Sequence, residues 1–144
     1  LEEKKVSLDL GKGEVECIVK GDELWHDGKH IGNCMYYDID TEKSQCELGI
    51  MIGDRNYWSK GYGTDVVKTA VTHIFQTTEL ERVYLHTLTD NYRAQKSFTK
   101  AGFTAICEKQ RDGYKFVFME IRRTMWEADQ AKSEIELSSR TSAN

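Results

Sequence analysis

The chain has 144 residues, enough for one domain with a buried core but too few for two. A formal net charge of -4, with 39% hydrophobic and 31% charged residues, argues against intrinsic disorder and against sequence-independent attraction to nucleic acid. No apolar run approaches the roughly 20 residues of a membrane-spanning helix, and the charged start lacks the apolar core of a signal peptide, so we expect a soluble protein without membrane or nucleic-acid partners.

The cysteines predict reduced thiols. They are scattered along the chain without CxxC spacing, and a domain of this size does not need disulfides for its stability. We therefore expect a cytoplasmic protein. The four cysteines are Cys17, Cys34, Cys46 and Cys107.

One evenly spaced set of potential metal ligands consists of His26, His30 and Cys34. The Asp27-Gly28 pair between the two histidines is a strong turn signal, so these histidines cannot share one face of a helix. We expect no metal site.

The first half of the chain has the patterns of strands. Short alternations predict strands over residues 6–10 and 15–19, and residues 22–40 form two extended runs around the Asp27-Gly28 turn. Residues 46–52 alternate strictly, so Glu47 points away from the aliphatic side chains of that strand. Beyond Gly63, apolar residues at i, i+1, i+4, i+5, i+8 and i+9 predict an amphipathic helix over residues 64–75.

The second half continues with a strand over residues 82–88 and a helix over 91–101 that ends at Gly102, a natural left-handed C-terminal residue. Residues 103–121 read as a hairpin around Asp112-Gly113. We predict a single α/β (α+β) domain over residues 1–123 with a mixed, mostly antiparallel central sheet flanked by helices. Residues 124–144 read as a polar tail with a frayed end from residue 138.

Two glycines, Gly61 and Gly63, stand immediately before the first predicted helix. Free backbone N–H groups and the helix dipole favour an anion there, and glycine lets a bulky diphosphate approach the backbone. The alternative is a tight strand-to-helix connection. A nucleotide-binding P-loop would need lysine and then serine or threonine after the second glycine, and a dinucleotide fingerprint would need a third glycine where Val66 stands.

Three runs of sequence resemble the GNAT superfamily of acetyl-coenzyme-A-dependent N-acetyltransferases, and within it the branch that acetylates polyamines and ribosomal-protein N-termini. They occur in the family's order and spacing, and the likeness covers roughly residues 24–122. The runs are DGKHIGNCMYYDIDTEKSQCELGIMIGDRNYWSKGYGTDVV, LTDNYRAQKSFTKAGF and RDGYKFVFMEI.

The resemblance implies a fold and a cosubstrate. The fold is the GNAT-like sheet with flanking helices, and the cosubstrate is acetyl-coenzyme A. The family's loop before the helix grips the coenzyme A diphosphate, and a second motif approaches its pantetheine arm and its adenosine end. Carried over, these assign Ser59, Lys60, Gly61, Tyr62, Gly63 and Thr64 to the diphosphate, Asn91, Arg93 and Ala94 to the arm, and Lys100 to an adenosine-end phosphate.

Acetyl transfer to an amine needs a base, an oxyanion donor and a proton for the leaving thiolate. Glu47 is the candidate base, because it stands on the strand leading into the glycine loop; the alternative is an ordinary solvent-facing glutamate. The resemblance places the oxyanion donor in the backbone of residues 50–52. The sequence departs from the family at the general acid, since Phe98 stands where relatives have tyrosine, and Tyr92 does not match that position.

The acceptor amine cannot be read from the sequence. Relatives wall the acceptor site with an N-terminal strand and two helices, so we expect either an incomplete N-terminal part or an open site. Glu47 and the acidic balance favour a cationic amine, which includes polyamines, small-molecule amines and protein N-termini. Two other hypotheses remain: an acyl-coenzyme-A-binding module without turnover, and an assembly domain that forms a homodimer through a sheet edge or an unwalled face.

Overall fold

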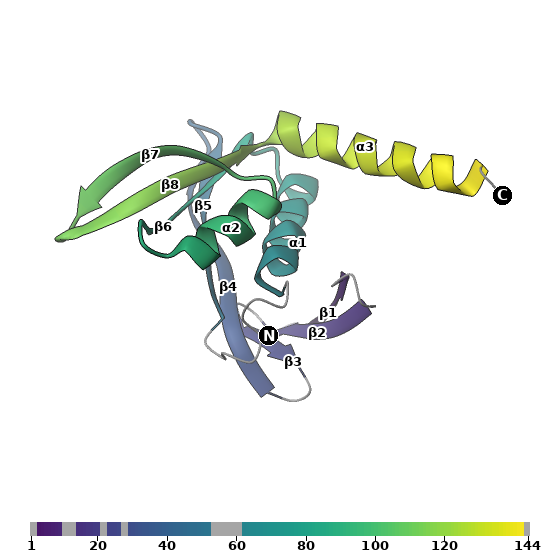
Figure 1. The fold of residues 1–144 in the computed structure, drawn as a ribbon, viewed down its shortest axis with the longest axis horizontal. Helices are drawn as coiled ribbons and strands as arrows, with labels where there is room; N and C mark the ends of the chain where they lie inside the picture. The colour runs from purple at the N-terminus through teal and green to yellow at the C-terminus, as the bar shows by residue number, and fades with distance from the viewer. Residues whose placement is uncertain (1–2, 10–13, 21–22, 27–28, 53–61, 143–144) are drawn as a thin grey trace.

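The computed structural model describes residues 3–9, 14–20, 23–26, 29–52 and 62–142, with side chains described for 32–51 and 64–135. Its described strands form one eight-stranded sheet in the order β1-β2-β3-β4-β5-β6-β8-β7 (Figure 1). Neighbours are antiparallel except β5 and β6, which confirms the mixed, mostly antiparallel sheet. The strands are β1 Glu3–Asp9, β2 Glu14–Lys20, β3 Glu23–His26, β4 Lys29–Asp40, β5 Gln45–Ile52, β6 Arg82–Leu88, β7 Thr104–Arg111 and β8 Tyr114–Arg122.

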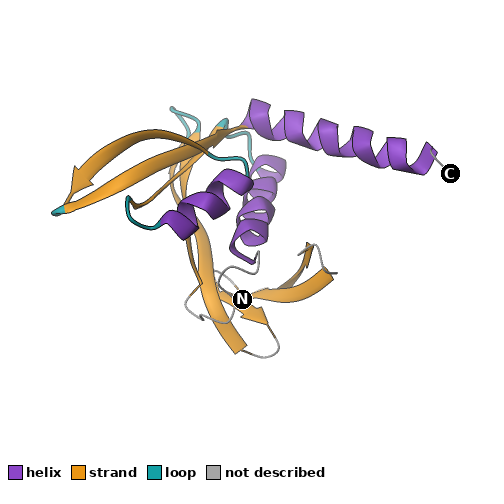
Figure 2. Ribbon diagram, in the orientation of Figure 1, coloured by secondary structure: helices purple, strands orange, loops and turns teal. Residues whose placement is uncertain are grey.

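Three helices complete the described chain: α1 Tyr62–Thr77, α2 Tyr92–Lys100 and α3 Arg123–Ser142. Helices α1 and α2 lie next to each other, and both pack on the same side of the sheet (Figure 2). Their apolar stripes and the inward-facing residues of β5, β6 and β8 form one buried cluster, which includes Cys46, Val71, Ile74, Leu85 and Met119. The opposite face of these strands is therefore the one that can expose polar side chains.

Both predicted hairpins have antiparallel strands. β3 pairs with β4, although Asp27 and Gly28 themselves lie outside the described residues. β7 pairs with β8 around Asp112 and Gly113, whose φ angles are 52° and 83°. Two successive positive φ angles are typical of a type I′ turn, the turn whose twist matches that of a β-hairpin.

Helix α2 ends at the predicted glycine. Gly102 has φ 104°, its N–H donates to the Thr99 carbonyl at 3.0 Å, and the Phe103 N–H donates to the Phe98 carbonyl at 3.0 Å. This is the Schellman pattern, and the rings of Phe98 and Phe103 add its usual apolar contact with 6.2 Å between centroids. The left-handed conformation at Gly102 turns the chain from α2 into β7.

Gly102→Ala is expected to destabilise the protein more than Gly113→Ala. Both substitutions place an L residue at positive φ, which costs about 1–2 kcal/mol. A Cβ at Gly102 would also lie 3.1 Å from Ile121 Cδ1, whereas a Cβ at Gly113 meets nothing within 4 Å. Urea denaturation of the two variants measures the difference in their free energies of unfolding. Equal losses would show that the Ile121 side chain moves aside without an energetic cost.

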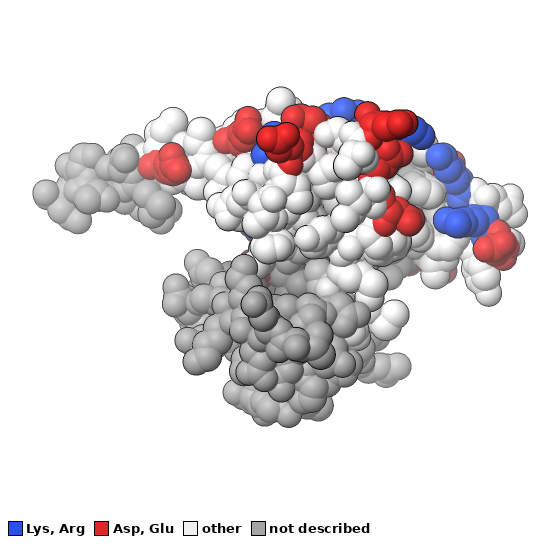
Figure 3. Space-filling view, turned by 180° about the vertical axis from the view of Figure 1, so that it is seen from behind, with Lys and Arg blue, Asp and Glu red and all other residues white. Residues whose placement is uncertain are grey.

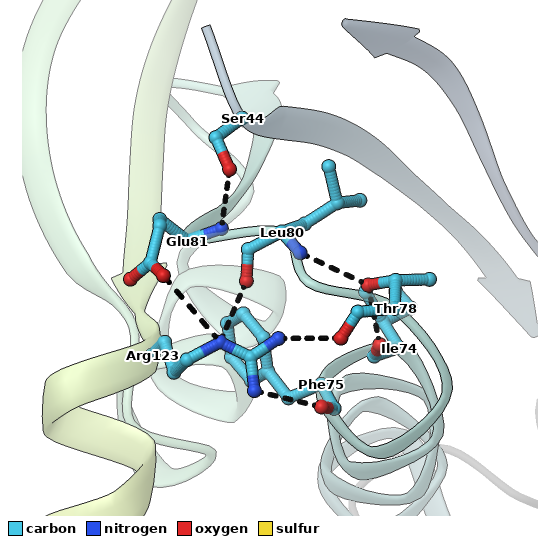
Figure 4. A network of polar contacts seen from close by, with 7 residues as sticks. All are labelled: Ser44, Ile74, Phe75, Thr78, Leu80, Glu81 and Arg123. Carbon is cyan, nitrogen blue, oxygen red and sulfur yellow. Dashed lines mark hydrogen bonds and ion pairs between the residues drawn. The ribbon is translucent and has the colours of Figure 1, made fainter. Parts of the chain in front are cut away.

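The C-terminal region differs from the predicted tail, since α3 continues to Ser142. Its first turns pack on α1: the rings of Trp126 and Phe75 have centroids 5.5 Å apart, and Trp126 Nε1 donates to Thr72 Oγ1 at 3.2 Å. Arg123 donates to carbonyls at and beyond the end of α1 (Figure 4). These contacts anchor the start of the helix, and its remainder extends away from the sheet (Figure 1).

Candidate active site

The described ladder between the two parallel strands is short. Gln45, Cys46 and Glu47 of β5 pair with Arg82, Val83 and Tyr84 of β6, and no later residue of β5 pairs with β6 in the described register. Both strands nevertheless continue, β5 paired with β4 as far as Ile52 and β6 paired with β8 as far as Leu88. Beyond Glu47, the backbone N–H and C=O groups on the facing edges of β5 and β6 are therefore not paired with each other. They are available to hydrogen-bond an extended ligand.

Glu47 stands at the last pair of this ladder. Its side chain lies on the face opposite the buried Cys46 and Leu48, as the alternation predicts, yet the residue is only 6% exposed. The alternative of a solvent-facing glutamate is therefore wrong. A buried carboxylate needs hydrogen-bond partners, because desolvating a charge without compensation is costly.

His86 provides one such partner. Its Nδ1 lies 2.6 Å from Glu47 Oε1, across 39 positions of sequence. The ring is held between two residues of β8: Phe116 meets it edge-on at 5.1 Å, and Phe118 stacks on it at 5.4 Å. The imidazole is thereby fixed in orientation toward the carboxylate.

Tyr37 and Tyr84 flank Glu47 on the neighbouring strands, opposite it in both registers. Burial raises the pKa of Tyr37, and the charge of Glu47 and a hydrogen bond to it raise this pKa further. Burial and the charges of Glu47 and Asp38 likewise raise the pKa of Tyr84, against the opposing charge of Arg82. Both hydroxyls therefore stay protonated at neutral pH, and the Tyr37 hydroxyl can donate to Glu47.

Asp38 and Gly49 shape the surroundings of Tyr37. The β4–β5 register shifts between Tyr37 and Asp40, and Asp38 adopts φ 51° within this bulge. A Cβ at Gly49 would lie 3.1 Å from Tyr37 Cε1, so the absence of a side chain at Gly49 leaves room for the ring beside Glu47. The bulge places a second carboxylate whose charge acts on both tyrosines.

A compensated charge cluster lies next to Tyr84, since the Arg82 guanidinium carbon is 4.9 Å from the centroid of the Tyr84 ring. Arg82 Nε and Arg122 Nε contact the two oxygens of Glu120 at 2.8 and 2.7 Å. Burial alone would raise the pKa of Glu120, but the hydrogen bonds and charges of these arginines outweigh it and lower that pKa. Seen from behind, Lys and Arg side chains gather over the β7–β8 end of the molecule, and much of the remaining described surface is uncharged (Figure 3).

Of the predicted coenzyme residues, Ser59, Lys60 and Gly61 lie outside the described residues. Tyr62 and Gly63 form the start of α1. Thr64 follows them, and its Oγ1 donates to the Ser97 carbonyl at 3.5 Å, so the N-terminal turn of α1 lies against α2.

At the start of α2, Asn91 is the N-cap, because its Oδ1 accepts from the Ala94 N–H at 3.2 Å. Ala94 packs on the core and Arg93 is exposed. Lys100 lies at the other end of α2, where it lines a cavity of about 380 Å³ among α1, α2 and α3. This cavity also contacts the core residues Val71 and Ile121, so it belongs to the helical side of the sheet, away from Glu47.

The family's general-acid position is part of the core. Phe98 is 7% exposed and packs on Phe103, whereas Tyr92 is 69% exposed at the start of α2. The described structure thus places two protonated tyrosines, Tyr37 and Tyr84, beside Glu47 and none at position 98.

Among the described residues, no group of three His, Cys, Asp or Glu side chains is arranged to hold a metal ion. No helix in the described ranges is long and apolar enough to cross a bilayer.

Sequence reasoning missed His86, Tyr37 and Tyr84. The alternation of Arg82, Tyr84 and His86 with Val83 and Leu85 was visible, and it already put these polar side chains on one face of a strand. The missing information was the register, since only the pairing of Glu47 with Tyr84 brings that face to the carboxylate.

The chain matches known acetyltransferases in sequence and in fold. The acetyltransferase (GNAT) domain family matches residues 11–104. The chain is 28% identical over 127 residues to the spermine/spermidine N(1)-acetyltransferase of Bacillus subtilis strain 168, covering 84% of this chain and 82% of that protein.

Two solved structures share the fold. One is the aminoglycoside acetyltransferase AAC(6')-Ib in complex with coenzyme A and kanamycin, with a TM-score of 0.66 at 19% identity over 80% of this chain and 70% of that chain. The other is a ribosomal-protein-S5-alanine acetyltransferase from Vibrio fischeri, with a TM-score of 0.65 at 18% identity over 78% of this chain and 63% of that chain. The chain belongs to the GNAT acetyltransferase family, and it is an N-acetyltransferase that uses acetyl-coenzyme A.

Proposed function

We propose that this enzyme acetylates a primary amine of a polyamine, by direct attack of the amine on acetyl-coenzyme A in a ternary complex, with Glu47 as the base. The observation that carries the proposal is the buried Glu47 carboxylate at the last β5–β6 pair, where the two strands stop pairing. The base is then next to unpaired backbone edges that can hold an extended, amide-bearing donor.

The surroundings of Glu47 favour a cationic acceptor. Glu47 and Asp38 both act electrostatically on Tyr37 and Tyr84, and Asp38 makes no ion pair or hydrogen bond among the described residues. Carboxylates and aromatic rings together attract alkylammonium groups. The B. subtilis relative is named for acetylating spermine and spermidine, which are polycations.

The chemistry follows from these positions. The ammonium group gives one proton to the Glu47 carboxylate, and the free amine attacks the thioester carbonyl. The tetrahedral intermediate loses the second proton of its nitrogen to water and collapses, the C–S bond breaks, and coenzyme A leaves as a thiolate. The Tyr37 and Tyr84 hydroxyls are protonated, and water or one of these hydroxyls returns a proton to the thiolate.

The coenzyme residues remain part of the proposal. Support comes from two described members of these motifs: the Thr64 hydroxyl of α1 contacts α2, and Asn91 caps α2. The residues proposed to bind acetyl-coenzyme A are Ser59, Lys60, Gly61, Tyr62, Gly63, Thr64, Asn91, Arg93, Ala94 and Lys100.

The proposal is tested by initial rates with matched amines. Spermidine, spermine and putrescine are compared with a monoamine, kanamycin and a peptide with a free N-terminus. We expect kcat/KM to be about 10-fold or more higher for the polyamines than for the monoamine. Coenzyme A is separated and quantified by chromatography, because the exposed Cys107 thiol would react with a colorimetric thiol reagent.

A preference for the peptide or for kanamycin would contradict the polyamine assignment and leave the transferase intact. Absence of turnover with every amine would favour the acyl-coenzyme-A-binding module instead. A homodimer also remains a proposal, supported by β7, whose residues are all exposed at the end of the described sheet. Light scattering measures it, and a monomeric mass would contradict it.

A further inference from the structure

We propose that His86 is a positioning residue for the reaction, which donates from Nδ1 to Glu47 and shares the proton that the carboxylate takes from the amine. This inference rests on the proposed function of Glu47 as the base. It assigns a role to a residue that none of the family motifs in this sequence includes.

The contact itself is the first support. A separation of 2.6 Å between His86 Nδ1 and Glu47 Oε1 is short for a nitrogen–oxygen hydrogen bond and typical of a bond to an ionised acceptor. The carboxylate accepts, so Nδ1 carries the hydrogen, and the second ring nitrogen is left to accept or release a proton. A single tautomer of His86 thus holds Glu47 in one rotamer.

The second support is the way that the ring is held. Phe116 and Phe118 of β8 fix the plane of the imidazole from two sides, at 5.1 and 5.4 Å. His86 lies two residues beyond Tyr84, the last β6 residue paired with β5. The imidazole therefore reaches Glu47 from the strand edge where pairing has ended, and its side chain remains 26% exposed to solvent.

The Asp38 carboxylate of β4 is another charge near this pair, since it acts on both tyrosines that flank Glu47. Tyr37 from β4 and Tyr84 from β6 present protonated hydroxyls. Lys109 Nζ of β7 lies 4.9 Å from the centroid of the Phe118 ring, and this ring stacks against His86. Glu120 of β8 is already neutralised by its two arginines.

Glu47 and His86 therefore act as one hydrogen-bonded pair in the reaction. One proton passes from the ammonium group to the pair in each turnover and leaves to solvent. Without His86, the buried carboxylate loses one donor and keeps the Tyr37 hydroxyl, and a buried carboxylate with fewer donors is harder to ionise.

The experiment compares three variants by kcat, KM and the pH dependence of kcat/KM. His86→Phe keeps a ring but removes the donor. His86→Asn keeps an N–H donor near the position of Nδ1 but does not titrate. His73→Asn is the matched control, because His73 is a half-buried histidine on α1 that contacts Tyr36 and lies on the helical side of the sheet.

We expect His86→Phe to lower kcat by roughly 30-fold or more, a part of the 10²–10⁴-fold that general acid–base catalysis supplies. Its acid limb should move to higher pH, while KM for acetyl-coenzyme A stays the same. His86→Asn should recover most of the lost kcat, and His73→Asn should resemble the wild type. A wild-type rate and profile in His86→Phe would overturn the inference, as would an equal loss in His86→Asn with unchanged circular dichroism.

A second measurement does not depend on turnover. In NMR spectra of the whole protein, the imidazole signals of His86 should change in Glu47→Gln, while those of His73 should not. If the wild type prefers another amine, the polyamine assignment fails and the kinetic comparison is made with that amine. If the wild type is active and the His86 signals are the same in the wild type and in Glu47→Gln, only the present inference fails.

Discussion

Glu47→Gln is expected to lower kcat by about 10²- to 10⁴-fold, the usual contribution of a general base. Glutamine keeps the size of the side chain and can still contact His86, but it cannot accept a proton from the ammonium group. The fold should be retained, because the substitution removes a buried charge and leaves a group that can hydrogen-bond. Steady-state rates of acetyl transfer, with calorimetric titration of acetyl-coenzyme A beside them, measure the effect.

The matched control is Glu108→Gln, because Glu108 is an exposed residue of β7 that makes no ion pair among the described residues. This variant should keep the wild-type rate. Unchanged donor affinity with lost turnover in Glu47→Gln would place Glu47 at the chemical step and exclude the binding module without turnover. Equal rates in Glu47→Gln and the wild type would refute the assignment of the base.

Arg123→Ala is expected to cost about 2–4 kcal/mol of the free energy of unfolding, because it leaves several half-buried carbonyls without a charged donor. The guanidinium donates to the carbonyls of Leu80 at 2.9 Å, Phe75 at 2.8 Å and Thr78 at 2.7 Å (Figure 4). It also lies 5.0 Å from the centroid of the Phe75 ring. One side chain at the start of α3 thus satisfies the end of α1 and the connection to β6.

The control for this prediction is Arg122→Ala, at the neighbouring position. Arg122 is 58% exposed and pairs with Glu120, which keeps Arg82 as a second partner. Exposed ion pairs contribute little, so this loss should stay below about 1 kcal/mol. Urea denaturation monitored by Trp fluorescence measures both variants, and similar midpoints for the two would show that water replaces Arg123 at the carbonyls.

The local sequence pattern was sufficient to predict most of the helices and strands. The spacing of Val67, Val71 and Ile74 predicted the buried stripe of α1, and residues 82–88 were predicted as the strand that the structure contains. The predicted helix end at Gly102 and the predicted turn at Asp112-Gly113 are confirmed, because these backbone conformations depend on the residues themselves. The motifs that identify the family are also local, so they could be recognised without a structure.

Helix α3 and the Arg123 contacts were not predicted, because they depend on residues that are far apart in the sequence. The segment after residue 123 has little apolar periodicity, so its sequence favours a polar tail. Its start becomes ordered because Trp126 meets Phe75 and Arg123 meets three carbonyls far away in the sequence. Such long-range contacts cannot be predicted from the pattern of neighbouring residues.

The sequence by itself determined most of the element types, the family and the face of β5 on which Glu47 lies. Only the tertiary structure decided that Glu47 is buried, that His86 contacts it, and that Tyr37 and Tyr84 flank it. The reason is register: Glu47 and His86 are 39 positions apart, and a shift of one residue between β5 and β6 would turn His86 to the other face of the sheet.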